Sequence, residues 1–148
     1  MRIIPLGGLE KIGMNITAFE YEDSIIVVDC GLSFPEEDML GIDLVIDHIG
    51  ALPYILRELN LPIYATKLTM GIIEKKLTEH NLLRSTRRKV VRHGQSINLG
   101  QFRIEFIKTN HSIQDASALA IYSPAGVVVH TGDFKVDYTP VFGDAIDL

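Results

Sequence analysis

Four histidine and aspartate residues of this 148-residue chain are the candidate ligands of a catalytic metal ion, and each lies beside a predicted strand or helix. Asp47 and His48 are adjacent, His111 follows a strand pattern, and Asp133 ends the sequence Val-Val-Val-His-Thr-Gly-Asp. Neutral imidazoles and carboxylates build hydrolytic Zn²⁺ or Mn²⁺ sites. Strand ends in a layered sheet gather along one edge, so these positions could converge on a metal. A lone histidine is more often a hydrogen-bonded structural residue, and spacing alone leaves both interpretations open.

The first elements that would position these residues form a predicted β-meander. Residues 3–8 are mostly apolar, residues 15–21 alternate between apolar and polar, and residues 25–28 are an apolar run that ends at Asp29. Asp29 could orient a ligand histidine without binding the metal itself. A strand-end carboxylate that accepts backbone hydrogen bonds is an equally good interpretation.

The middle of the chain has the pattern of a loop followed by two helices. Residues 31–46 contain proline, two glycines and an acidic run, which is typical of an irregular loop. Apolar residues from Ile49 onward recur at helical spacing, with Pro53 tolerable only in a first turn. A short strand is predicted at 61–65, and Thr66 is a candidate cap for the second helix.

Five of the fourteen basic residues lie between Arg84 and Arg92, interleaved with two valines, which predicts a strand with a basic outer face. A solvated face is the simpler interpretation, and an RNA contact through Arg87 and Arg88 is the more specific one. Alternation then predicts a hairpin over 96–108 and two further strands at 118–122 and 127–131.

Composition limits the class of protein. Hydrophobic residues make up 47% and charged residues 22%, which indicates one globular domain. The net charge of −5 argues against a free-standing nucleic-acid-binding protein. The single cysteine, Cys30, excludes an intrachain disulfide and favours a cytoplasmic location. No apolar run is long enough for a signal peptide or a membrane span.

Several motifs together resemble bacterial ribonuclease J, a family of the β-CASP branch of the metallo-β-lactamase superfamily. The resemblance spans essentially the whole chain. The matching segments are Pro5–Leu9, Val27–Gly31, Phe34–Asp43, Asp47–Tyr54, Asn110–Ser112 and His130–Lys135.

This resemblance implies the αββα sandwich of the metallo-β-lactamase fold, an arrangement of α/β (α+β) layers. The chain would be the N-terminal portion only, with one sheet and part of its helical cover. It also implies a two-zinc ribonuclease, with Mn²⁺ or Mg²⁺ as alternatives, that acts 5′ to 3′ and also cuts internally through a metal-bound hydroxide. Asp47 and His48 resemble the end of a His-x-His-x-Asp-His ligand motif, His111 the next ligand, and Asp133 the carboxylate that bridges both metals. Asp47 would also hold or accept a proton of the attacking water.

The sequence departs from the family pattern in two places. Asp47 follows Ile46 directly, so the His-x-His half of the ligand motif is missing and a segment between 46 and 47 is expected to be omitted. We also expect the β-CASP domain and the C-terminal part of the metallo-β-lactamase domain to be absent from 1–148. Residues 1–148 would then be the N-terminal part of a metallo-β-lactamase domain.

Three interpretations remain open. The first is a working ribonuclease J from which this chain omits a segment; it would form a homo-oligomer, bind RNA and meet RNA-degradation partners. The second is a catalytically inactive fragment or pseudoenzyme that serves as an RNA- or protein-binding module. The third and weakest is a hydrolase of the same fold that acts on a small ester or lactam.

Overall fold

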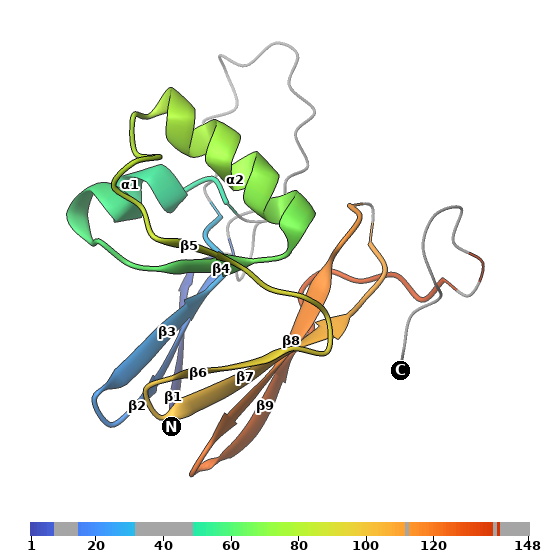
Figure 1. The fold of residues 1–148 in the computed structure, drawn as a ribbon. Helices are drawn as coiled ribbons and strands as arrows, with labels where there is room; N and C mark the ends of the chain where they lie inside the picture. Colours follow the sequence, from blue (N-terminus) through green and yellow to red (C-terminus); the bar gives the residue numbers. More distant parts are fainter. Residues whose placement is uncertain (8–14, 32–48, 112, 138, 140–148) are drawn as a thin grey trace.

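The computed structural model describes residues 1–7, 15–31, 49–111, 113–137 and 139. These residues form nine strands and two helices (Figure 1). In chain order they are β1 (Arg2–Gly7), β2 (Ile16–Tyr21), β3 (Ser24–Val28), α1 (Leu52–Glu58), β4 (Ile63–Ala65), α2 (Lys67–Glu79), β5 (Arg88–Val90), β6 (Ser96–Leu99), β7 (Phe102–Lys108), β8 (Ser117–Ser123) and β9 (Gly126–His130).

Two antiparallel sheets share one hydrophobic core. The predicted meander forms the three-stranded sheet β1-β2-β3, and the predicted hairpins form the four-stranded sheet β6-β7-β8-β9. Phe19 pairs with Ile26 in the first sheet, and Ile104 pairs with Ile121 in the second. All four side chains belong to a single buried cluster, so the core faces of both sheets are removed from water together.

The hairpin tips join the two sheets at the end where β3 and β7 begin. Ser24 Oγ accepts a hydrogen bond of 3.0 Å from the backbone N–H of Gln101. Gly100 has a φ of +57°, and a Cβ built there would lie 2.2 Å from Ser24 Oγ, so this contact requires glycine. Because β3 and β7 both run away from these tips, both strands carry the chain toward the opposite end of the two sheets.

The helices and a short parallel ladder form the remaining layers. β4 pairs with β5 in parallel, and both helices lie above this ladder, on the side away from the antiparallel sheets (Figure 1). Leu77 is fully buried, and Met70 and Ile73 are nearly so, in a second core with Ala65 of β4. Pro53 lies in the first turn of α1, as predicted, where its missing N–H breaks no helical hydrogen bond.

The described fold is mixed α+β, as expected in outline, with two differences from the sequence-based predictions. The expectation of one sheet is wrong, because β6–β9 form a second sheet that packs against the first through the shared core. The basic strand is shorter than predicted: β5 spans only Arg88–Val90. The predicted loop over 31–46, Asp47, His48 and the join between 46 and 47 lie outside the described residues, apart from Gly31.

Candidate metal centre

Sheet topology brings two of the predicted ligands to the same edge. β7 and β9 each pair antiparallel with β8, so they run in the same direction and end together. His111 lies three residues beyond β7, and Asp133 lies three residues beyond β9. His111 Nε2 is 3.9 Å from Asp133 Oδ2, with the histidine side chain 14% and the aspartate side chain 43% exposed. The structure therefore forms a largely buried imidazole beside an accessible carboxylate.

The two loops that carry these residues are joined by hydrogen bonds. The Asn110 side-chain amide donates to the carbonyl of Asp137 at 3.0 Å, and the backbone N–H of Lys135 donates to the carbonyl of Asn110. Gly132 has a φ of +58°, the left-handed conformation that glycine adopts without strain, and it turns the chain into Asp133. The separation of His111 and Asp133 is thus set by paired backbone segments as well as by their side chains.

Asp29 faces a histidine, but not one of the predicted ligands. Its Oδ2 is 3.7 Å from Nε2 of His130, the last residue of β9. Asp29 itself has a φ of 61°, a conformation uncommon for residues other than glycine and tolerated best by Asn and Asp. The pair connects the end of β3 to the end of β9, three residues before Asp133. Its predicted role in orienting a ligand histidine stays a prediction.

His111 and Asp133 fit one zinc ion but do not complete a site. Zinc binds imidazole nitrogen and carboxylate oxygen at about 2.0–2.2 Å in a tetrahedral arrangement, so two ligands of one ion lie about 3.4 Å apart. The observed separation of 3.9 Å is about 0.5 Å longer, so a small side-chain adjustment would bring both atoms to one ion. Within the described part of the chain, no group of three or more His, Cys, Asp or Glu residues is placed to hold a metal. Asp47 and His48 would have to contribute from outside it.

Cys30, next to Asp29, has an environment that suppresses its reactivity. Burial, and secondarily the negative charge of Asp29, raise the pKa of the Cys30 thiol to about 11. A thiol with this pKa stays protonated at neutral pH and is a poor metal ligand or nucleophile. The candidate metal ligands at this edge are therefore histidine and carboxylate side chains.

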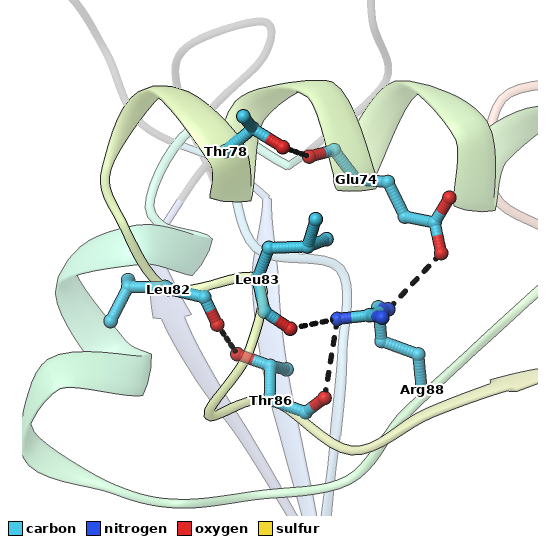
Figure 2. Close-up of polar contacts among 6 residues, drawn as sticks. All are labelled: Glu74, Thr78, Leu82, Leu83, Thr86 and Arg88. Atoms are coloured by element: carbon cyan, nitrogen blue, oxygen red, sulfur yellow. Dashed lines mark hydrogen bonds and ion pairs between the residues drawn. The ribbon is translucent and has the colours of Figure 1, made fainter.

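The predicted RNA contacts, Arg87 and Arg88, differ in how many hydrogen bonds and ion pairs they form within the protein. Arg88 forms an ion pair with Glu74 of α2 at 3.1 Å and donates to the carbonyls of Leu83 and Thr86 (Figure 2). Arg87 is exposed and donates to the carbonyl of Asn60 at 3.2 Å. An RNA contact by either residue stays a prediction, and Arg87 has the more accessible side chain.

From the sequence, no role in the site was assigned to three residues that lie at this edge. His130 pairs with Asp29, and His93, predicted only as a turn residue, has Nε2 3.1 Å from the carbonyl oxygen of Ala116. Asp115 contacts the start of α2. The sequence could have identified His130 as a candidate site residue, since it ends a strand three residues before Asp133. The roles of His93 and Asp115 depend on long-range contacts that local patterns do not reveal.

Neither helix in the described part of the chain is both long and apolar enough to cross a membrane. No protein-family model matches the sequence. A solved structure titled as a protein of unknown function from Enterococcus faecalis V583 is similar, with a TM-score of 0.62 and 20% sequence identity. The match covers 90% of this chain and 43% of that one, and it supports the mixed α+β fold alone.

Sequence comparison gives closer relatives. Ribonuclease J of Synechocystis sp. is 39% identical over 173 residues, covering 100% of this chain and 27% of the relative. Ribonuclease J of Helicobacter pylori is 42% identical over 172 residues, and that of Thermus thermophilus is 39% identical over 178, each again covering 100% of this chain. The chain spans about a quarter to a third of the length of these relatives. The resemblance to bacterial ribonuclease J that its motifs indicate is therefore confirmed along the whole length of this chain.

Proposed function

We propose that this chain is the N-terminal part of the metallo-β-lactamase domain of a ribonuclease J, a zinc-dependent enzyme that hydrolyses RNA. One observation carries the proposal: His111 and Asp133, two expected ligands, lie 3.9 Å apart at one sheet edge in a chain that matches ribonuclease J throughout. The substrate is RNA, degraded from the 5′ end and cut internally, and the ions are two zinc ions per site, with Mn²⁺ or Mg²⁺ as substitutes.

The residues of this chain would share the work as follows. His111 would bind the metal through Nε2 and Asp133 through its carboxylate. Asp47 and His48 would supply further ligands. Zinc bound there supplies a Lewis acid that lowers the pKa of water and stabilises negative charge on the phosphate. Asp47 holds or accepts the proton that leaves the attacking water. Asp29 and His130 fix the ends of β3 and β9 relative to each other, so the loop that carries Asp133 starts from a fixed point.

A complete two-metal site also requires the missing His-x-His residues. We propose that a segment is omitted between Ile46 and Asp47. Alignments with the relatives extend over 172 to 178 residues, against 148 in this chain, which supports an internal omission without fixing its position. A peptide map of the protein tests this. Peptides that contain His-x-His between Ile46 and Asp47 are expected, and a peptide in which these two residues are directly joined would contradict the proposal.

From the same family relationship we also propose that the protein is a homo-oligomer in the cytoplasm and that it contacts other RNA-degradation proteins. A single cysteine in the chain fits a reducing compartment. The alternative is a catalytically inactive RNA- or protein-binding module, for which no feature of the described residues argues specifically. It becomes the preferred interpretation if the protein binds RNA without hydrolysing it.

RNA hydrolysis by the complete zinc-loaded protein, which includes the His-x-His segment and the rest of the enzyme, tests the proposed function. We expect activity on a 5′-monophosphorylated RNA, loss of activity with a chelator, and recovery on adding zinc. In the complete enzyme, His111→Ala and Asp133→Ala should each abolish hydrolysis while circular dichroism shows a folded protein. His80→Ala and Asp23→Ala are the matched controls, because these residues lie at the end of α2 and in the β2–β3 turn, away from the sheet edge. Wild-type turnover in either site variant would falsify the ligand assignment.

A further inference from the structure

The loop between β7 and β8, which carries His111, is held from two sides. On one side, His93 Nε2 lies 3.1 Å from the carbonyl oxygen of Ala116 and 3.0 Å from Ser117 Oγ. A carbonyl only accepts hydrogen bonds, so Nε2 donates to Ala116. On the other side the loop contacts the first turn of α2 through Asp115, four residues after His111.

Thr66 is a buried residue that makes a second contact between the loop and α2. Its side chain was expected to cap α2, and it does occupy the N-cap position, but it makes no capping hydrogen bond within the helix. Thr66 is instead 6% exposed, and its hydroxyl lies 3.2 Å from the carbonyl oxygen of Asp115 and 3.1 Å from Thr69 Oγ1. Because a hydroxyl has one hydrogen and the carbonyl has none, Thr66 donates to Asp115 and Thr69 donates to Thr66.

Asp115 replaces Thr66 as the cap of the helix. Its Oδ2 accepts a hydrogen bond of 3.4 Å from the N–H of Leu68, one of the first-turn groups that have no partner inside a helix. A carboxylate is also favoured at this end by the helix dipole. Asp115 has a φ of 64°, and its backbone carbonyl and its side chain both point at the start of α2. The loop and the helix therefore depend on each other for their polar contacts.

We infer that Thr66 is a positioning residue for the metal centre: its hydroxyl ties the His111 loop to α2 and so fixes the His111 imidazole opposite Asp133. This inference rests on the proposed function for its consequence, and on the hydrogen bonds of Thr66 and Asp115 for its geometry. α2 suits the purpose because its apolar face is anchored in the second core by Met70, Ile73 and Leu77. The helix thus gives the loop a rigid point of attachment that the sheet edge alone does not provide.

The test uses an isosteric change, a conservative rescue and a matched control. Thr66→Val keeps the shape of the side chain and removes the hydroxyl, and Thr66→Ser keeps the hydroxyl. Thr78→Val is the control, because among the described residues the Thr78 hydroxyl bonds only the Glu74 carbonyl of its own helix, at 2.7 Å (Figure 2). Changes in groups that orient metal ligands typically weaken metal binding by roughly 10–100-fold, so we expect about a tenfold loss of zinc affinity in Thr66→Val. Thr66→Ser and Thr78→Val should bind zinc as the wild type does.

Two measurements separate this inference from the proposed function. Zinc affinity is measured by chelator competition, and the ring resonances of His111 are followed by NMR without metal. If the wild type binds zinc and Thr66→Val binds it equally well, the inference is overturned while the proposed function stands. If the complete wild-type protein, with its His-x-His segment, binds no zinc, the proposed function fails, and the NMR spectra decide the inference alone. A shift of the His111 resonances in Thr66→Val, absent from Thr78→Val, then supports it, and unchanged resonances overturn it.

Discussion

Replacing Arg88 distinguishes a structural arginine from an RNA-binding one. The guanidinium joins three segments: Glu74 in α2, Leu83 and Thr86 in the connection after it, and β5 itself (Figure 2). Thr86 is held in turn by its hydroxyl, which donates to the Leu82 carbonyl at 2.8 Å. We predict that Arg88→Ala destabilises the protein and that lysine at this position restores only part of the lost stability.

The magnitude follows from the partners. The ion pair with Glu74 is partly solvated, with side chains 25% and 48% exposed, so it contributes about 0.5 kcal/mol. The two carbonyl contacts of Nη1 are charge-assisted, and after allowance for their partial exposure they contribute about 1.5 kcal/mol together. Arg88→Ala should therefore cost about 2 kcal/mol, a fall in Tm of roughly 6 °C for a chain of this size. Glu74→Ala removes only the ion pair and should cost about 0.5 kcal/mol.

Urea unfolding and RNA affinity are measured on the same variants. Lysine cannot reproduce the planar fork that reaches a carboxylate and two carbonyls at once, but it satisfies a phosphate as a point charge. Arg88→Lys should thus lose about 1 kcal/mol and keep its RNA affinity. Arg84→Ala, an exposed change in the same connection, should stay within about 0.5 kcal/mol of the wild type. If Arg88→Ala is as stable as Arg84→Ala while RNA affinity falls, the structural assignment is refuted.

Two further predictions concern residues at opposite ends of the sheets. Because the pKa of Cys30 is raised from 9.0 to about 11, native protein at pH 8 should react with a thiol reagent about 100-fold more slowly than urea-unfolded protein, and equal rates would contradict the assigned burial. For the same reason, the stability that the protonated thiol contributes should fall as the pH rises from about 9 through about 11. Gly100→Ala should cost about 1–3 kcal/mol by urea unfolding, from the close approach to Ser24 and the positive φ, and an unchanged midpoint would show that the hairpin tips are not in contact.

Local sequence patterns predicted most of the secondary structure because the deciding interactions are short in range. Alternation identified β2 and both hairpins, and helical spacing with proline in the first turn identified α1. The number of sheets was missed because it depends on which strands pair, and β6–β9 form their own ladder. Thr66 illustrates the same limit: the residue type predicted a cap, but a loop 49 positions away takes its hydroxyl.

The candidate site was predicted in the same partial way. His111 and Asp133 were identifiable because each follows a strand pattern, and antiparallel pairing through β8 brings those strand ends together. The partner of Asp29 was not identifiable, since pairing with His130 depends on how the two sheets pack. Arg88 carried a charge pattern that favoured a solvated face or RNA, whereas the fold places its guanidinium among protein carbonyls.

Anomalous X-ray scattering at the zinc absorption edge, from crystals of the zinc-loaded protein, shows directly whether His111 and Asp133 bind zinc. If His111 and Asp133 are zinc ligands, a peak lies about 2.0–2.2 Å from both His111 Nε2 and an Asp133 carboxylate oxygen. A second peak on the other side of the Asp133 carboxylate is expected when the His-x-His segment is present. A zinc-binding protein whose peaks lie away from both His111 and Asp133 would contradict the proposed metal centre.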